Sequence, residues 1–448
     1  MDLSWIYGHA RVAFHHAKKT VVLPTKSGEK TSLEAICKEV TPPCYLNPLL
    51  FNGHLQTAWT AMKSEGPRII YKRKIFESYD PRFAGIYTVD FVTHTPAEVD
   101  DETLPPRTTY YSETELAELE AGSDDDKPML ITLHGLSGGS HEIYLRQVLA
   151  PLVRDGKWEA VVVNSRGCAM SEITTGILYN ARATWDMRQT VEWCRKKFPN
   201  RPLYAIGYSL GANILTNYLG EEGENCVVNA AVVVASPWNL EVAALALQRT
   251  WLGMNVYSKT MANSMRKLFD RHAKMIMENG NIDEEKIRRI KYLHEFDREI
   301  QGPTWGYPTE GAYYRDASSV DLVDKIRIPV FIINAEDDPI AVHEAIPYEE
   351  IKQNPYTVLC TTSLGGHLSW FEIGGTRWFS KPAANFLQKM ADDIDVGKID
   401  GPKGTMAPRA AVAENATGYK SPFVYEPVRR KLRLDYRDSV KTNAALEM

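Results

Sequence analysis

Residues 202–215 read PLYAIGYSLGANIL, and this stretch decides the fold. An apolar run ends in residues 207–211 (GYSLG), and a helical pattern begins directly after them. A Gly-x-Ser-x-Gly sequence between a strand and a helix is typical of a sharp turn that exposes a nucleophilic serine, because its glycines keep side chains away from the bend. The same five residues can arise by chance in a loop, but the strand and helix around them favour the turn. We therefore predict that Ser209 is a nucleophile.

From residue 128 onward, apolar runs of the kind buried in a parallel sheet alternate with amphipathic helices. The runs lie at 129–133, 159–163, 203–206, 227–235, 330–333 and 357–360, and two of the helices lie at 144–152 and 183–197. Two earlier runs, 68–76 and 85–94, also have strand character and are expected at the leading edge of the sheet. This order predicts an α/β fold with a mostly parallel, doubly wound sheet.

The chain divides into a main domain with flanking segments. We expect residues 1–65 to form an N-terminal extension over the main domain, which occupies residues 66–390. Residues 391–448 become polar and then basic, so we expect a partly disordered tail.

A long insertion, at about residues 237–323, separates two of the predicted strands. It is rich in Trp, Tyr, Met and Leu, and it has helical patterns around 260–277 and 283–299. An insertion of this size can be a helical cap over an active site or a peripheral helical subdomain.

Composition limits the classes of function. With 448 residues, of which 44% are hydrophobic, the chain can bury a large core. Its net charge is -5 and its basic residues form no long block, so we expect no nucleic-acid partner. The six cysteines include no C-x-x-C pair, so neither a zinc site nor a disulfide framework is indicated. A reducing, intracellular and cytoplasmic location fits this usage best.

No segment of the sequence has the pattern of a signal or a membrane span. Residues 1–5 (MDLSW) lack a basic stretch followed by a long apolar run, so we expect no secretory signal. The most apolar stretch, 226–240, is interrupted by polar residues and Pro237 and is too short to cross a bilayer. Any contact with a membrane or a lipid droplet is therefore expected to be peripheral.

A serine hydroxyl needs a base and an orienting carboxylate before it can attack a carbonyl carbon. Residues 331–340 (FIINAEDDPI) end an apolar run in carboxylates, and residues 364–368 (LGGHL) follow the next run. Asp338 is preferred to Asp337 as the acid because it lies deeper in the turn, immediately before a proline. Asp337 is then a solvated neighbour or a helix-capping carboxylate. His367 is the predicted base, although two glycines before it also suit an ordinary loop histidine.

Acyl transfer also needs donors for the oxyanion. Residues 131–140 (ITLHGLSGGS) are a strand followed by a loop with little side-chain bulk, so the predicted donors are the backbone amides of Leu136 and Leu210. The stretch does not match a phosphate-binding loop, because neither Gly-Lys-Ser/Thr nor Gly-x-Gly-x-x-Gly occurs in it. We expect no cofactor and no metal. His134 is expected to shape the loop, and His54 to be packed or hydrogen-bonded and not catalytic.

Several stretches together resemble the α/β-hydrolase superfamily, and specifically the AB hydrolase 4 family. This family includes bacterial YheT-like hydrolases, mammalian α/β-hydrolase-domain lipases and yeast medium-chain fatty acid ethyl ester synthase/esterases. The matching stretches are 47–57, 134–139, 164–168, 207–223, 313–318 and 365–367. The resemblance implies an α/β-hydrolase fold, a triad of Ser209, Asp338 and His367, and both ester hydrolysis and acyl transfer to alcohols. It also implies fungal relatives, some of which act in secondary metabolism.

We therefore expect a serine esterase and acyltransferase that takes medium-chain acyl groups from an ester or acyl-CoA. Water or an alcohol can accept the acyl group, and sequence does not decide between them. None of the histidines has an aspartate five positions later, so the His-x-x-x-x-Asp motif of some acyltransferases is absent. The alternatives are a phospholipase, a thioesterase that releases a polyketide, or a non-catalytic binding protein on the same fold.

Overall fold

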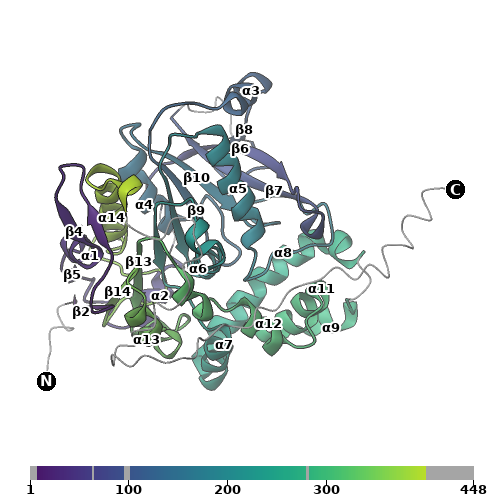
Figure 1. Ribbon diagram of the computed structural model, residues 1–448. Helices are drawn as coiled ribbons and strands as arrows, with labels where there is room; N and C mark the ends of the chain where they lie inside the picture. Colours follow the sequence, from purple (N-terminus) through teal and green to yellow (C-terminus); the bar gives the residue numbers. More distant parts are fainter. Residues whose placement is uncertain (1–7, 63–64, 95–100, 279–281, 400–448) are drawn as a thin grey trace, which may run out of the picture.

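The predicted parallel runs form the centre of one sheet in the computed structural model, which describes residues 8–62, 65–94, 101–278 and 282–399 (Figure 1). Adjacent strands run parallel in the order β14 (Thr357–Thr362), β13 (Val330–Ala335), β12 (Ala230–Val234), β11 (Leu203–Tyr208), β9 (Met129–Leu133) and β10 (Glu159–Asn164). Nearly all their residues are buried, as expected where helices cover both faces. The prediction of a mostly parallel sheet is confirmed.

Antiparallel strands complete the sheet at both edges. On one side, β7 (Ile86–Thr93) pairs with β10 and β6 (Ile70–Glu77) pairs with β7, while β8 (Thr108–Tyr110) runs parallel to β6. On the other side, β2 (Val12–His16) pairs antiparallel with β14. Among the described residues the order is β2-β14-β13-β12-β11-β9-β10-β7-β6-β8.

The N-terminal segment therefore does more than lie over the main domain. Its strand β2 covers the edge of β14, whose backbone groups would otherwise be unpaired. Helix α1 (Leu33–Val40) packs against α14 (Ser380–Asp392), and α2 (Gly53–Trp59) follows. The short strands of this segment are β1 (His9–Ala10) with β5 (Cys44–Tyr45), and β3 (Val22–Pro24) with β4 (Lys30–Ser32).

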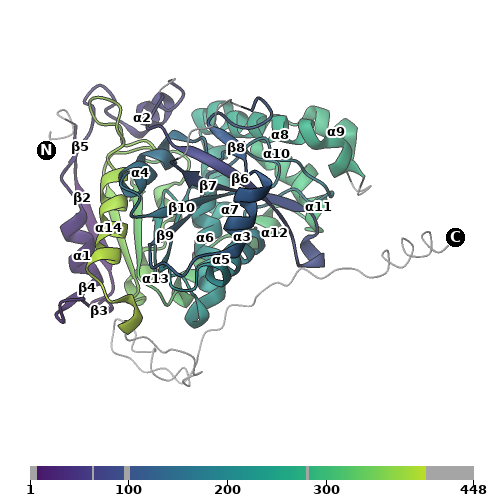
Figure 2. The ribbon, with the colours of Figure 1, turned by 90° about the horizontal axis from the view of Figure 1, so that it is seen from above.

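Helices lie on both faces of the sheet (Figure 2). Helices α1, α4 (Ile143–Val153) and α14 lie on one side, and α5 (Thr184–Lys197) and α6 (Leu210–Glu222) lie on the other. Two further helices are α3 (Glu113–Ala121) and α13 (Tyr348–Gln353). Of the predicted tail, the described part continues to residue 399, and residues 400–448 lie outside the described chain. None of the described helices combines the length and the apolar character that a membrane span requires.

The insertion between β12 and β13 is helical throughout much of its length. Its helices are α7 (Leu240–Arg249), α8 (Lys259–Met277), α9 (Glu284–Arg289), α10 (Leu293–Phe296), α11 (Gly302–Trp305) and α12 (Glu310–Ala317). The predicted helix at 260–277 is confirmed by α8. The helical pattern around 283–299 is also confirmed, by α9, α10 and a π-helical turn at Asp297–Gln301. These helices are separate because the backbone is extended at Tyr292, where the Glu295 side chain accepts the Tyr292 amide and a new helix begins.

Candidate active site

Ser209 occupies the sharp bend between β11 and α6. Its φ angle of 51° lies in the left-handed region, which is strained for a residue with a side chain. At positions 207 and 211, the neighbouring backbone leaves room only for glycine. A Cβ on Gly207 would lie 2.5 Å from the carbonyl oxygen of Gly211, and a Cβ on Gly211 would lie 2.4 Å from that of His134. The GYSLG sequence therefore allows the bend that the apolar strand and the following helix suggested.

His367 lies between Ser209 and Asp338. The distance from His367 Nε2 to Ser209 Oγ is 2.8 Å, and the distance from His367 Nδ1 to Asp338 Oδ2 is also 2.8 Å. A carboxylate can only accept, so Nδ1 carries the proton and Nε2 is free to accept the serine proton. The structure thus brings the three predicted residues into one hydrogen-bonded relay.

The topology explains how residues far apart in sequence meet. Ser209 follows β11, the Asp338 loop follows β13, and the His367 loop follows β14. Because these strands are parallel, their carboxyl ends lie along the same edge of the sheet, where open α/β sheets form their sites.

Asp338 is held in place by its own loop. Its Oδ1 accepts hydrogen bonds from the backbone amides of Ile340 and Ala341, both at 2.8 Å, while Oδ2 faces His367. The residue is only 4% exposed. These contacts fix the carboxylate so that one oxygen remains directed at the imidazole.

Asp337 has a different structural role from the solvated or helix-capping one expected. Its Oδ1 accepts the amide of Gly366 at 2.9 Å, so it connects the acid loop to the histidine loop. Its Oδ2 is buried and has no hydrogen-bond partner among the described residues. Burial raises the pKa of Asp337 to about 6. The carboxyl group therefore supports the loop that carries His367 and does not contact the imidazole nitrogen.

Helix α2 supports the histidine loop from the other side, which the sequence did not suggest. The amide of His367 donates to Thr57 Oγ1 at 2.9 Å, and that of Phe371 donates to the buried Gln56 Oε1 at 2.7 Å. A Cβ on Gly53 would lie 1.9 Å from the carbonyl oxygen of Asp337, so α2 also lies directly against the acid loop. The only sequence signal was that residues 47–57 form one of the stretches behind the family resemblance.

His54 is also on α2, but it points to the helical insertion. Its Nδ1 lies 2.7 Å from the hydroxyl of Tyr257, and the two rings stack with centroids 5.7 Å apart. His54 is therefore a hydrogen-bonded histidine, as predicted, and it connects α2 to the insertion.

The loop after β9 approaches the serine closely. A Cβ on Gly135 would lie 3.4 Å from the Cβ of Ser209. Two buried tyrosines fix the loop on either side of Leu136: the amide of Gly135 donates to the hydroxyl of Tyr144 at 2.8 Å, and that of Ser137 donates to Tyr179 at 2.9 Å. The Leu136 amide has no hydrogen-bond partner within the described part of the chain.

Leu210 provides a second amide near the serine. It is the first residue of α6, and the first N–H groups of a helix have no partner within the helix. Leu136, Ser209 and Leu210 all line one pocket. The two amides predicted as oxyanion donors therefore lie in the loop after β9 and in the first turn of α6, which both border the pocket beside Ser209.

His134 is a structural part of the same loop. Its Nδ1 donates to the carbonyl oxygen of Gly135 at 2.6 Å, and its Nε2 accepts the amide of Ser165 at 3.0 Å. Burial lowers the pKa of His134 to about 4, so the ring is neutral near pH 7. Since both ring nitrogens are used, His134 shapes the loop and does not act as a second base.

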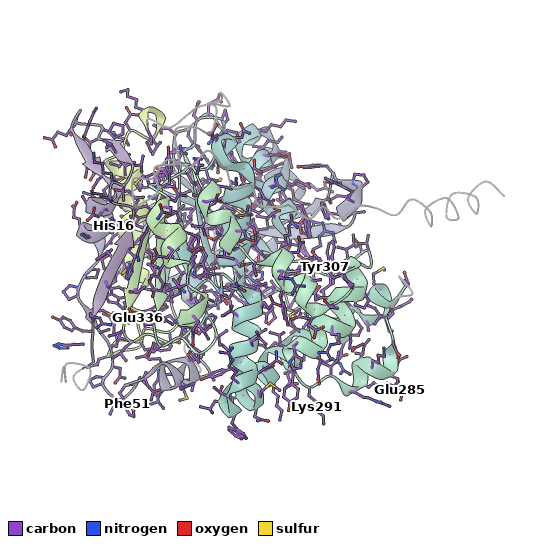
Figure 3. All side chains as sticks on the ribbon, turned by 60° about the horizontal axis from the view of Figure 1, so that its bottom comes forward. His16, Phe51, Glu285, Lys291, Tyr307 and Glu336 are labelled. Carbon is purple, nitrogen blue, oxygen red and sulfur yellow. The ribbon has the colours of Figure 1, made fainter. Side chains whose placement is uncertain are left out.

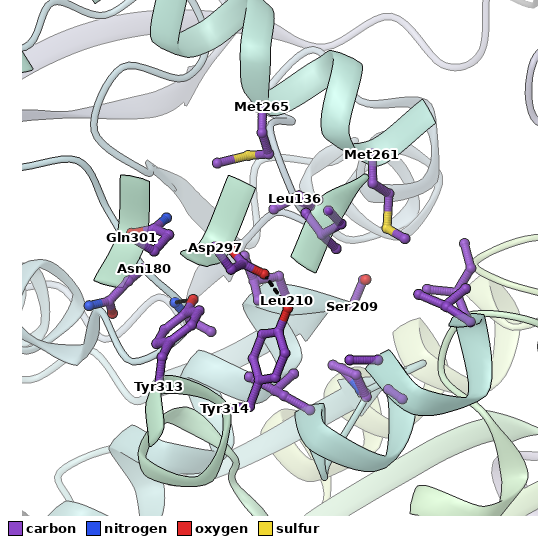
Figure 4. Close-up of a pocket in the computed structure, with 18 of the residues that line it drawn as sticks. Leu136, Asn180, Ser209, Leu210, Met261, Met265, Asp297, Gln301, Tyr313 and Tyr314 are labelled. Atoms are coloured by element: carbon purple, nitrogen blue, oxygen red, sulfur yellow. Dashed lines mark hydrogen bonds between the residues drawn. The ribbon is translucent and has the colours of Figure 1, made fainter. Parts of the chain in front are cut away.

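The pocket beside Ser209 has mostly apolar walls (Figure 4). A mostly apolar lining with a few polar groups is typical of sites that bind small molecules. Much of the wall comes from the helical insertion, through Leu240, Ala243, Ala244, Leu247, Met261, Met265, Leu293, Tyr313 and Tyr314. The insertion therefore borders the same pocket as Ser209.

Comparison with known proteins shows similarity to one family and to several lipases and esterases. The model of the alpha/beta hydrolase fold family matches residues 128–372. The chain is 38% identical over 369 residues to a monoacylglycerol lipase of Saccharomyces cerevisiae, covering 78% of this chain and 81% of that protein. It is 32% identical over 390 residues to medium-chain fatty acid ethyl ester synthase/esterase 2 of the same yeast, covering 77% and 85%. It is 27% identical to human phospholipase ABHD3, covering 83% and 85%.

The expected fold and family are thereby confirmed. The matched region contains the strands of the parallel sheet, the serine turn and both the acid and histidine loops. The relatives named above are lipases, esterases and a phospholipase. The chain therefore belongs to the alpha/beta hydrolase fold family.

Proposed function

We propose that this protein is a serine esterase that forms an acyl-enzyme at Ser209. The observation that carries the proposal is the relay in which His367 lies 2.8 Å from both Ser209 Oγ and Asp338 Oδ2. The lipase and esterase names of its relatives support the same reaction class.

In the first half-reaction, Ser209 Oγ attacks the ester carbonyl carbon while its proton moves to His367 Nε2. Asp338 stabilises the imidazolium that forms. The carbonyl electrons move onto oxygen, which accepts hydrogen bonds from the amides of Leu136 and Leu210. Collapse of this intermediate breaks the bond to the alkoxy group, which takes the proton from His367 and leaves as an alcohol.

The second half-reaction repeats these steps with a new nucleophile. His367 accepts a proton from water or from an alcohol, whose oxygen attacks the acyl carbon attached to Ser209. Water yields a free acid, and an alcohol yields a new ester; in both cases Ser209 recovers its proton. We propose that this protein uses both acceptors, as the name of the synthase/esterase relative suggests for that protein.

We propose a medium-chain acyl group as the preferred donor, carried by an ester or by coenzyme A. The apolar pocket beside Ser209 can bury an acyl chain, which is favoured by about 0.8 kcal/mol for each CH₂ group removed from water. The medium chain length is proposed from the name of the yeast synthase/esterase relative, which states it for that protein.

We further propose that the protein approaches its substrate at a lipid surface. Large apolar side chains are exposed on the two segments that the His54–Tyr257 contact connects. They are Leu49, Phe51, Leu55 and Trp59 on one segment, and Trp251, Leu252 and Val256 on the other. Leu49 is 81% exposed and Trp251 is 71% exposed. Figure 3 brings this side forward, with Phe51 near its lower rim. A contiguous exposed apolar patch marks a site of membrane or partner contact, and we propose that these side chains form one.

The test is a product analysis with ethyl and p-nitrophenyl esters from butanoate to palmitate, with and without added ethanol or methanol. Free acid and newly formed ester are quantified separately by mass spectrometry. The proposal expects a maximum at medium chain length and new ester formation that rises with alcohol concentration. Free acid as the sole product at every alcohol concentration would contradict the acyl-transfer part, and no turnover of any ester would contradict the esterase itself.

A further inference from the structure

Besides Ser209 and three tyrosines, a carboxylic acid and two amide side chains line the mostly apolar pocket. Asp297, Gln301 and Asn180 all line it, and they are 7%, 2% and 1% exposed. Burying such groups costs free energy unless they are hydrogen-bonded, so each needs an explanation.

Hydrogen bonds within the protein satisfy these groups only in part. The hydroxyl of Tyr314 donates to Asp297 Oδ2 at 2.6 Å, and no cation pairs with Asp297 in the described part of the chain. Gln301 Nε2 donates to the carbonyl oxygen of Tyr179 at 2.9 Å, and Asn180 accepts the amide of Arg182 at 2.8 Å. Gln301 Oε1 and Asn180 Nδ2 have no partner among the described residues. One acceptor and one donor are therefore left open.

The local backbone directs two of these groups to the same place. Asp297 and Gln301 are the first and last residues of a π-helical turn, and at this spacing their side chains share a face. Short π-helical turns are frequent at functional sites. Figure 4 shows Asp297, Gln301 and Asn180 grouped in the pocket, with Ser209 across from Gln301 and Asn180.

We propose that Asn180, Asp297 and Gln301 form a binding site for a hydroxyl group of the substrate. A hydroxyl both donates and accepts, so it can donate to Gln301 Oε1 or Asp297 and accept from Asn180 Nδ2. An unsubstituted alkyl chain would leave the open groups unpaired. This inference rests on the proposed esterase function and narrows its substrate class to esters that carry a free hydroxyl group.

The ionisation of Asp297 agrees with a hydrogen-bonding role. Burial raises the pKa of Asp297 to about 7, and Tyr314 provides its one hydrogen bond from a side chain of the described chain. The carboxyl group is thus close to balance between its neutral and charged forms at neutral pH, and either form accepts a hydrogen bond from a hydroxyl.

The hydroxyl can belong to either half of the ester. In a partial glyceride it lies on the alcohol half, and in a hydroxy-fatty ester it lies on the acyl half. Three ligands of the same chain length separate these sources: glyceryl monooctanoate, ethyl 8-hydroxyoctanoate and ethyl octanoate. Ethyl octanoate has no hydroxyl and serves as the reference.

The experiment is calorimetric titration of the Ser209→Ala protein with each ligand below its aggregation concentration. This variant keeps the pocket and removes the proposed nucleophile, so binding is measured whether or not the protein is an esterase. We expect one hydroxylated ester to bind at least about tenfold more tightly than ethyl octanoate. Which one binds more tightly identifies the half of the substrate that carries the hydroxyl.

Two substitutions in the Ser209→Ala background locate the effect. Asp297→Leu is expected to reduce the preference for the hydroxylated ester to about threefold or less, because a leucine cannot accept a hydrogen bond. Gln301→Met preserves length and tests the same site if Asp297→Leu does not fold. Met261→Leu, an apolar exchange in the same pocket, is the control and should affect all three ligands alike.

Equal affinities for ethyl octanoate and both hydroxylated esters would overturn the proposal. It would also be overturned if Asp297→Leu and Gln301→Met, once shown to fold by their unfolding transitions, preserved the full preference. Failure of the esterase function is recognised separately, as absence of ester turnover by the unsubstituted protein.

Discussion

The choice between two adjacent carboxylates gives a sharp prediction: Asp338→Asn should nearly abolish ester turnover, whereas Asp337→Asn should not. In the structure, the amides of Ile340 and Ala341 both donate to Asp338 Oδ1 at 2.8 Å. An asparagine would keep its oxygen there and turn its NH₂ group toward His367. The imidazole would then have to accept at Nδ1 and carry its proton on Nε2, where it faces Ser209.

That tautomer cannot take the serine proton. The corresponding loss in other serine triads is about 10⁴-fold in kcat, which corresponds to about 5 kcal/mol of transition-state stabilisation. We expect a similar fall in kcat for Asp338→Asn, with KM changed little because the carboxylate does not line the pocket beside Ser209. The assay is the initial rate of p-nitrophenyl octanoate hydrolysis over a range of substrate concentrations.

Asp337→Asn is the matched control. The asparagine oxygen can still accept the Gly366 amide, and the pKa of the replaced carboxyl is already raised to about 6 by burial. The expected decrease in kcat is less than about tenfold. A greater loss in Asp337→Asn than in Asp338→Asn, with both variants folded, would refute this assignment of the acid.

Three further predictions test the surroundings of the relay. Thr57→Val should lower kcat/KM by about tenfold because the His367 amide loses its acceptor, while Thr57→Ser should retain activity; equal rates for both variants would contradict the role of α2. The raised pKa of Asp337 means that the folded state holds its proton more tightly than the unfolded state, so wild-type stability falls as pH rises from about 4 to about 6. In urea unfolding, the free energy of unfolding of Asp337→Asn, relative to that of wild type, should therefore rise by about 2 kcal/mol between about pH 4 and about pH 8. A difference between the two proteins that does not change with pH would contradict this cause. Trp251→Ser should weaken sedimentation with phosphatidylcholine vesicles by about tenfold, whereas Val22→Ser, on exposed β3, should not; equal binding of both would contradict the proposed lipid-facing surface.

Much of the parallel sheet could be predicted because its strands are buried on both faces and read as continuous apolar runs. The place of the site could be predicted from the same strands. Polar residues at 209, 338 and 367 come after such runs, and parallel strands bring their carboxyl ends together. The sequence was less informative at β2, whose pairing with β14 depends on a partner more than 300 residues away, as the pairing of His16 with Val358 shows.

The contacts that hold the His367 loop could not be predicted either, because they join segments that are far apart in the sequence. Thr57 and Gln56 bind backbone amides of the histidine loop, and an amide contact leaves no pattern in the side chains of the loop it holds. The cluster of Asn180, Asp297 and Gln301 could not be predicted, because the sequence pattern indicates only a helix and a loop for the segments that contain these residues. Only the folded insertion places Asp297 and Gln301 beside Asn180.

The most direct test of the central claim is the mass of the protein after reaction with a fluorophosphonate, followed by peptide mapping. The relay from Asp338 through His367 predicts one phosphonyl adduct, located on Ser209, and no adduct on Ser209→Ala protein that unfolds at the same temperature as wild type. An unlabelled wild-type protein, or an adduct of equal yield on the Ser209→Ala protein, would contradict the account.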